Sequence, residues 1–451
     1  MKWNRIMSEN LLDQMRLAIA PLSHMQRIGR VSGVSGGTVR CACRMEETSV
    51  GDRGTIKIGD HQRIGEVVKL DHDGAHLLME GATDGISMHD PVVFRVAPVF
   101  APDASWIGRV LDPDGVPLDG RPLLPGPHAQ DLNADPPPSH QRRGLGARLE
   151  TGLAVLNTLL PIVRGQRVGL FAGSGVGKST LLADLAKGIE ADVIVIALVG
   201  ERGREVGHFV KDVLGLEGMK RAVVVAATSD TGPQVRRRCA LSAMTVAETF
   251  RDQGKHVLLL VDSVTRFCEA HRELAVASGE SANLRGYPAS TGPAVARLCE
   301  RAGPGVDSAG DITAVLSVLV AGSDMEEPVA DMLRGVLDGH IVLDREIAER
   351  GRFPAIDVVR SVSRALPDAA NAKENEIIAQ ARALLGAFAR SQLMVQSGLY
   401  TAGSDPLLDA AISAAPALDE FQAIKDSRGT LTHFAKLRQA ILSSPMRTEP
   451  I

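Results

Sequence analysis

The sequence predicts an α/β core that is preceded by a small β-barrel and followed by a helical domain. Short β-like segments separated by glycine turns fill residues 24–98. From about residue 150 to 365, apolar runs alternate with helical stretches, which is typical of a mostly parallel sheet covered on both faces. After residue 372 the composition shifts to Ala, Glu, Leu, Gln and Arg, with few strand candidates. We therefore divide the chain into residues 1–23, 24–98, 99–366 and 367–451.

Residues 1–23 are expected to form an amphipathic helix outside the barrel. Five apolar side chains share the spacing of one helical face, and charged or polar residues occupy the other: Leu11, Leu12, Met15, Ile19 and Leu22. Two interpretations stay open. The helix packs on its own domain, or it detaches and binds a partner or a membrane surface.

The expected barrel strands are Ile28–Val34, Thr38–Cys43, Gly54–Ile58, Gly65–Leu70, His76–Met79 and Pro91–Val96. Barrels of this size can bind oligonucleotides, but such binding needs stacked aromatic side chains. Phe94 is the one aromatic residue in this stretch, so a structural or ring-forming role is favoured.

The start of the third region is expected to be a strand followed by turns at residues 106–120. Residues 121–143 are rich in proline and polar residues, including Pro136–Pro138, and predict an extended segment that runs along the domain that follows. Apolar runs at 168–172, 193–199, 222–227, 257–261 and 312–320 are the expected strands of the sheet.

Composition excludes several function classes. The net charge of −4 and an aromatic content of 3% argue against general nucleic-acid binding. The five cysteines form no C-x-x-C pair, which indicates reduced thiols used in packing rather than in metal binding. No apolar stretch approaches the roughly 20 residues that cross a bilayer, and the charged N-terminus is not a secretory signal.

Residues 168–180 carry the clearest motif. A short apolar strand meets a glycine-rich turn and then a helical pattern, which is the context of a P-loop. Glycine N–H groups and the helix N-terminus would surround a phosphate, Lys178 would reach the β- and γ-phosphates, and Ser179 would ligate Mg²⁺. The motif departs from its usual form at Ala172, which is acceptable where that residue keeps a negative φ. The expected nucleotide-binding residues are Ala172, Gly173, Ser174, Gly175, Val176, Gly177, Lys178, Ser179 and Thr180.

Two further stretches carry acidic residues at strand ends. The apolar run 257–261 ends in Asp262, which we expect to hold Mg²⁺, since a strand ending in a carboxylate is the Walker B arrangement. The run 193–199 leads into Gly-Glu-Arg-Gly-Arg-Glu at 200–205. Loops beyond the carboxyl ends of parallel strands face the ligand, so Glu201 is our candidate base that orients water opposite the γ-phosphate. A solvated, salt-bridged loop is the alternative.

Four motifs together resemble the catalytic β-subunit family of rotary ATP synthases, and within it the ATPases of flagellar and virulence type III protein export. They are residues 172–179 (AGSGVGKS), 200–205 (GERGRE), 258–267 (LLLVDSVTRF) and 354–364 (PAIDVVRSVSR). The 403–409 stretch and a short C-terminal domain favour the export branch. The resemblance implies an α/β P-loop (RecA-like) ATPase core that binds ATP and Mg²⁺.

The resemblance also implies roles for single residues. Glu201 corresponds to the catalytic glutamate, and Arg202 and Arg266 to arginines that face the γ-phosphate. Glu205 corresponds to a ligand of magnesium-bound water. Phe353 corresponds to the aromatic that stacks on adenine, and Arg364 to an arginine finger supplied to the nucleotide of a neighbouring copy.

The resemblance further implies a homohexamer in the cytoplasm, peripheral to the inner-membrane export apparatus. Its expected partners are a regulator dimer on the N-terminal helix, a coiled-coil stalk protein in the ring pore, a membrane export gate and chaperone–substrate complexes, but no nucleic acid. We expect the flagellum-specific export ATPase. A virulence ATPase and a rotary synthase subunit are alternatives. A hexameric RNA translocase is disfavoured by the barrel, which offers only Phe94 for stacking.

Overall fold

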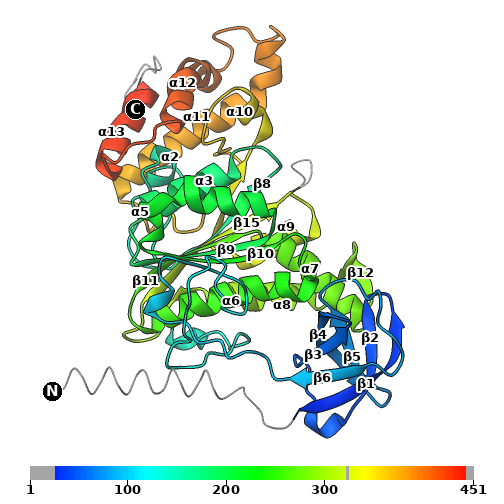
Figure 1. Ribbon diagram of the computed structural model, residues 1–451. Helices are drawn as coiled ribbons and strands as arrows, with labels where there is room; N and C mark the ends of the chain where they lie inside the picture. Colours follow the sequence, from blue (N-terminus) through cyan, green and yellow to red (C-terminus); the bar gives the residue numbers. More distant parts are fainter. Residues whose placement is uncertain (1–25, 321–324, 443–451) are drawn as a thin grey trace, which may run out of the picture.

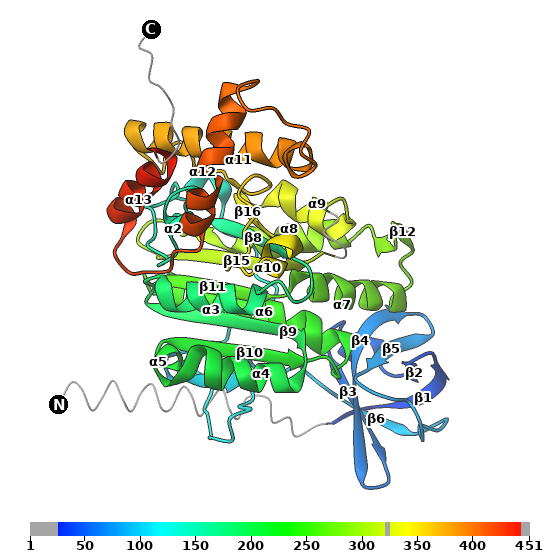
Figure 2. The same ribbon diagram turned by 90° about the horizontal axis from the view of Figure 1, so that it is seen from above.

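The computed structural model describes residues 26–320 and 325–442. Within them, a closed β-barrel, an α/β region and a group of C-terminal helices follow one another along the chain. The barrel and the C-terminal helices lie at opposite ends of the α/β region in both views (Figures 1 and 2). This architecture confirms the predicted fold class. The predicted amphipathic helix at residues 1–23 lies outside the described residues.

The barrel closes in the strand order β1-β2-β5-β4-β3-β6. Alternation of buried and exposed residues builds its interior, as in β2, where Val39 and Cys41 are buried and their neighbours are not. Gly54 faces the same interior, and a Cβ there would come within 2.0 Å of the Leu77 side chain. The strands match the predicted ones within a few residues: β1 (Arg27–Ser35), β2 (Thr38–Ala42), β3 (Arg53–Ile58), β4 (His61–Asp71), β5 (Gly74–Met79) and β6 (Pro91–Arg95).

The central sheet has the order β17-β16-β8-β15-β11-β9-β10-β7. Every neighbouring pair is parallel except β16 and β17. The carboxyl ends of β8, β15, β11 and β9 therefore meet at one edge, which is where ligands bind in such sheets. The strands are β7 (Arg109–Leu111), β8 (Arg167–Ala172), β9 (Val193–Glu201), β10 (Ala222–Thr228), β11 (His256–Asp262), β15 (Asp311–Leu319), β16 (Gly339–Leu343) and β17 (Val362–Ser363).

Helices cover both faces of this sheet, because its strands are apolar on both sides (Figure 1). On one face, α3 (Lys178–Gly188) packs Leu181 and Leu185 into a core that includes Leu170. On the other, α6 (Pro233–Asp252) and α7 (Val264–Ala277) share a core with Phe171, the next residue of β8. The remaining core elements are α2 (Ala154–Asn157), α4 (Gly203–His208), α5 (Gly215–Met219), α8 (Thr291–Arg301), α9 (Pro328–Val336), α10 (Arg345–Glu349), β12 (Ala282–Leu284), β13 (Tyr287–Pro288) and β14 (Gly303–Pro304).

The C-terminal helices are α11 (Ala372–Gln396), α12 (Pro406–Gln422) and α13 (Thr430–Leu442). Helix α11 begins at a capping box, in which Asn371 and Glu374 each accept a hydrogen bond from the other's backbone N–H. Buried residues of all three helices join the core on the α3 face of the sheet. The helical domain is thus continuous with the layer that carries the P-loop helix.

The proline-rich segment runs along the α/β region, as the sequence predicts. Backbone bonds tie it to the chain before it, from Gly126 N to Ala101 O at 2.6 Å and from Gln130 N to Phe100 O at 2.7 Å. Further along, Arg301 of α8 donates to the Leu132 carbonyl at 2.6 Å.

The five cysteines, all within the described residues, form no disulfide. No helix in the described part of the chain is long and apolar enough to span a membrane.

Candidate active site

The P-loop connects the end of β8 to the start of α3. Gly175 and Gly177 take left-handed φ values of 78° and 88°, which only glycine adopts at low cost. A Cβ at Gly175 would meet nothing within 4 Å, so the loop is open to solvent there. Ala172 is the last residue of β8 and has no positive φ, which satisfies the condition for an alanine at this position. Val176 turns its side chain into the core, where it is 2% exposed.

A cavity of about 960 Å³ lies over this loop. Its size is at the upper end of the range for small-molecule and cofactor pockets. The sequence-predicted residues that line it are Ala172, Gly173, Ser174, Gly175, Gly177, Lys178, Ser179, Thr180, Glu201, Arg202, Glu205 and Arg266. The structure thus brings the P-loop and the 200–205 stretch to one cavity, at the carboxyl edge of the sheet.

Lys178 is the centre of the polar contacts in this cavity. Its ammonium group contacts the Asp262 carboxylate directly and lies 3.9 Å from Glu201 Oε1. All three side chains are largely buried, with exposed fractions of 12%, 6% and 19% for Lys178, Asp262 and Glu201. One cation therefore faces two carboxylates in a partly desolvated site, where ionic interactions are stronger than in water.

Asp262 is the last residue of β11 and is fixed from the neighbouring strand. The Ser317 hydroxyl on β15 donates to Asp262 Oδ1 at 2.7 Å, and both residues are buried. Ser317 was not predicted from the sequence. Its position, as a hydroxyl residue within the apolar run 312–320, is the feature of the sequence that could have predicted a polar role.

Glu201 is the last residue of β9 rather than a loop residue, because Thr228 pairs with it through a register shift and Ser229 N donates to its carbonyl at 3.0 Å. Burial and the nearby charge of Asp262 raise the pKa of Glu201 to about 7, while Lys178 acts in the opposite direction. A carboxyl group with a pKa near neutrality suits proton transfer at physiological pH.

Glu205 and Arg202 form a pair at the rim of the cavity. Arg202 Nη1 donates to Glu205 Oε1 at 2.8 Å, and Arg202 is mostly exposed. Burial opposes the ionisation of Glu205, but hydrogen bonds from Arg202 and Glu201 hold its pKa below the usual range. Glu205 therefore stays ionised under conditions in which Glu201 takes up a proton.

Arg266 and Thr265, at the start of α7, line the same cavity. Arg266 Nη1 donates to Glu269 Oε2 at 2.8 Å, and Thr265 Oγ1 accepts from Leu319 N at 2.9 Å. Thr265 and Glu269 were not predicted from the sequence. Neither were Ser229, Arg285 and Tyr287, which line the cavity from other elements and carry no motif of their own.

Phe353 and Arg364 lie apart from the polar centre. The Phe353 ring packs on the P-loop, since a Cβ at Gly177 would lie 3.3 Å from Cδ1 and Cε1 of the ring. Arg364 is exposed and follows β17, where it donates to the Leu337 carbonyl at 3.1 Å and the Arg334 carbonyl at 3.2 Å. Neither Arg364 nor Phe353 is among the residues that line the cavity of their own chain.

The donor set suits a nucleotide with a hard divalent cation. Ser179 at the start of α3 and Asp262 behind Lys178 offer oxygen atoms, which Mg²⁺ prefers together with phosphate oxygens. No group of three or more His, Cys, Asp or Glu side chains in residues 26–320 and 325–442 could hold a metal by itself. A site of this kind fits a cation that arrives with its nucleotide.

Comparisons with known proteins agree with this chemistry. The nucleotide-binding domain of the ATP synthase alpha/beta family matches residues 152–363, and the T3SS EscN ATPase C-terminal domain matches residues 370–439. The flagellum-specific ATP synthase of Caulobacter vibrioides is 42% identical over 90% of this chain and 94% of its own length. The type 3 secretion system ATPase of Pseudomonas syringae pv. syringae is 40% identical over 87% of this chain and 89% of its own.

Solved structures of type III secretion ATPases are also similar to this chain. The assembled ATPase EscN of the enteropathogenic E. coli type III secretion system matches with a TM-score of 0.84 and 35% identity, over 92% of this chain and all of that one. EscN in complex with its central stalk EscO matches with a TM-score of 0.80 over the same shares.

The fold and the cavity define an ATP-hydrolysing enzyme of the P-loop class. The chain belongs to the ATP synthase alpha/beta family, in the branch of the flagellum-specific and type III secretion ATPases.

Proposed function

We propose that this chain hydrolyses ATP in the cavity above the P-loop and that it drives protein export through a flagellar type III apparatus. The observation that carries the chemistry is the cluster of Lys178, Glu201 and Asp262, in which Lys178 and Glu201 line the cavity and Asp262 contacts Lys178. The match of residues 370–439 to the EscN-type C-terminal domain favours export over a rotary synthase subunit.

In the proposed mechanism, the P-loop amides and Lys178 hold the β- and γ-phosphates of ATP. Lys178 moves from its contact with Asp262 toward the phosphates, which frees that carboxylate. Ser179 and Asp262 would then hold Mg²⁺, directly or through water, with Glu205 further out. When bound, this ion neutralises charge that develops on the phosphate oxygens.

Glu201 positions a water in line with the γ-phosphate and takes its proton. Its place opposite Lys178 and its raised pKa support this role. Arg202 and Arg266 at the same cavity would carry charge on the phosphate that leaves. Phe353 would hold the adenine ring next to the P-loop.

We further propose that the site is completed by Arg364 of a second copy in a homohexameric ring. Support comes from the exposed place of Arg364 outside its own cavity, and from a relative, EscN, that has been solved assembled and with a central stalk. By the same likeness we expect a stalk protein in the ring pore. We also propose that the chain is cytoplasmic and peripheral to the inner membrane. Its further proposed partners are a regulator dimer, an export gate and chaperone–substrate complexes.

The test of the proposed function has two parts. The purified chain should release phosphate from Mg-ATP, and Lys178→Ala should abolish this release. Deletion of the chain from its native cell should remove flagellar filaments while the secretion of virulence proteins continues. Loss of secreted virulence proteins with intact filaments would instead support the virulence alternative, for which the 40% identity to a type 3 secretion system ATPase is the motivation.

A further inference from the structure

Residues 352–357, which we call the base-side loop, connect the nucleotide site to the helical domain. On one side this loop is bonded to β16: Ala355 accepts from Asp344 N at 2.9 Å, and Asp357 N donates to the Val342 carbonyl at 2.9 Å. β16 lies next to β8, and Leu343 is paired with Ala172 at the start of the P-loop. The loop thus extends the layer that carries the P-loop.

On its other side, the loop is held by Arg352, which is 8% exposed. The guanidinium Nη2 donates to the Ile356 carbonyl at 2.9 Å, so it spans the loop that carries Phe353. Nη1 donates to Gln422 Oε1 at 3.0 Å, and Nε lies 3.1 Å from Asp419 Oδ1. Gln422 and Asp419 both belong to α12 of the helical domain.

Gln422 is itself fixed in place. It is 4% exposed, and its amide Nε2 donates to the Leu418 carbonyl of its own helix at 3.0 Å, which leaves the oxygen to face Arg352. Nη1 and Nη2 of Arg352 therefore have hydrogen-bond partners, whereas Nε makes the ion-pair contact with Asp419 without a hydrogen bond. A buried guanidinium is costly unless it is paired. The position of Arg352 is therefore tied to the position of α12.

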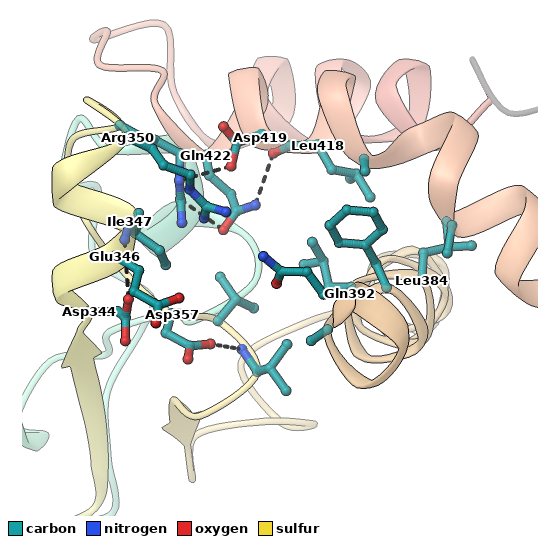
Figure 3. A pocket seen from close by; sticks show the side chains of 18 of the residues that line it. Asp344, Glu346, Ile347, Arg350, Asp357, Leu384, Gln392, Leu418, Asp419 and Gln422 are labelled. Carbon is teal, nitrogen blue, oxygen red and sulfur yellow. Dashed lines mark hydrogen bonds and ion pairs between the residues drawn. The ribbon is translucent and has the colours of Figure 1, made fainter. Parts of the chain in front are cut away.

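Apolar packing contributes to the same junction as these polar contacts, since Ile356 of the loop is buried in one core with Leu418 and Phe421 of α12. A cavity of about 410 Å³ lies beside them, between α10, the segment after the base-side loop, α11 and α12. Figure 3 shows Asp344, Glu346 and Ile347 at the left of it, Leu384 and Gln392 of α11 at the right, and Leu418, Asp419 and Gln422 of α12 along the top. Beside this cavity, Arg352 adds a directional polar link between α12 and the loop.

We propose that Arg352 is a positioning residue, which sets Phe353 against the P-loop and passes the position of helix α12 to the base side of the nucleotide site. This inference rests on the proposed function, because it takes Phe353 as the aromatic that stacks on adenine. Arg352 touches neither the phosphates nor the reacting water. Its effect is confined to the part of the nucleotide that Phe353 contacts.

The experiment compares the affinities of the full-length chain for Mg-ATP and for inorganic tripolyphosphate with Mg²⁺, which lacks the base. In Arg352→Gln, the affinity for ATP should fall roughly 10-fold, the scale of a lost base–aromatic stack, with tripolyphosphate binding unchanged. Gln422→Leu should give the same loss, and the double variant no further loss, since both act through one contact.

Arg148→Gln is the matched control. Arg148 also bridges the α/β region and the helical domain, with Nη2 2.9 Å from Glu374 Oε2, but it does not touch the base-side loop. It should leave both affinities unchanged. Where Arg352→Gln does not fold, Gln422→Leu carries the test alone.

Three results would overturn the proposal: equal losses for ATP and tripolyphosphate, an unchanged ATP affinity, or a selective ATP loss in Arg148→Gln. A wild-type chain that binds tripolyphosphate as tightly as ATP would instead remove the stacking role of Phe353. That result concerns the proposed function and is obtained before any variant is compared.

Discussion

Lys178 Nζ lies 3.9 Å from Glu201 Oε1 across the cavity, and the same ammonium group contacts Asp262. Lys178, at the start of α3, thus faces the carboxyl ends of two strands, β9 and β11. The nucleotide phosphates would have to compete with these carboxylates for Lys178. This competition makes both binding and chemistry depend on the same three side chains.

Lys178→Ala should leave a folded chain that binds Mg-ATP roughly 100-fold more weakly, since one partner of a desolvated charge contact is lost. Affinity and melting temperature should be measured on the same sample. Lys187→Ala, which removes an exposed lysine in the last turn of the same helix, is the control for general damage and should keep the affinity. An unchanged affinity in folded Lys178→Ala would place the nucleotide elsewhere.

Glu201→Gln should keep ATP binding and lose hydrolysis by roughly 10²-fold or more, because a positioned base contributes about that much. Steady-state phosphate release at saturating ATP measures this. Glu217→Gln is a matched control, since Glu217 lies on α5 and pairs with Lys220 at the surface. If Glu201→Gln hydrolyses ATP at near wild-type rate, Glu205 becomes the candidate base.

The pH dependence of hydrolysis should report the Glu201 carboxyl group. With a pKa of about 7, the base is lost as pH falls, so kcat/KM should drop tenfold per pH unit below 7 and level off above it. ATP also titrates in this range, and ATP binding by Glu201→Gln over the same pH values supplies the correction. A profile without a limb near neutrality would contradict the assignment.

The same carboxyl group makes a prediction for stability. Its pKa rises from 4.5 in the unfolded chain to about 7 in the folded one, so the folded state binds more protons between these values and stability falls as pH rises through them. Glu201→Gln lacks this penalty. The melting temperature of the variant should equal that of the wild type at pH 4 and exceed it at pH 8, provided that both fold reversibly.

The junction of barrel and core offers a test of the fold. Arg238 of α6 contacts Glu66 of β4 and lies 3.1 Å from Asp114 Oδ1, and all three side chains are largely buried. Arg238→Ala leaves two carboxylates without this cation and should lower the free energy of unfolding by about 3 kcal/mol. Arg44→Ala removes an exposed pair with Glu47 and should cost less than about 1 kcal/mol. Denaturant midpoints that do not differ would contradict this ranking.

Much of the fold follows from local sequence pattern. The apolar runs at 168–172, 193–199 and 257–261 predict β8, β9 and β11, because strands buried on both faces need uninterrupted apolar side chains. β16 was missed, since only Ile341, Val342 and Leu343 of its five residues are apolar and the run is too short to stand out. Its place in the sheet comes from pairing with β8 rather than from its own pattern.

The functional site could likewise be predicted only where it depends on local sequence. The P-loop and Asp262 could be predicted because each is a local motif with its own flanks. The bond from Ser317 to Asp262 joins residues 55 apart in the chain, and that from Arg352 to Gln422 joins residues 70 apart. Such contacts depend on strand order and on domain packing, which no local pattern encodes.

We propose that ATP is hydrolysed at a site shared by two copies of the chain. Arg364→Ala should bind nucleotide but hydrolyse it roughly 10³- to 10⁵-fold more slowly, the usual contribution of an arginine finger. Glu201→Gln alone should also be inactive. In rings that contain both variants, some interfaces pair an intact Glu201 with an intact Arg364.

Steady-state hydrolysis by the two variants, alone and mixed above the assembly concentration with subunit exchange confirmed, is the most direct test. The shared site predicts that part of the wild-type activity returns on mixing. If Arg364 acted within its own subunit, every site would lack one group and mixing would restore nothing. No recovery in rings shown to contain both variants would contradict the shared site and leave Arg364 as a residue that only holds the carbonyls of Leu337 and Arg334.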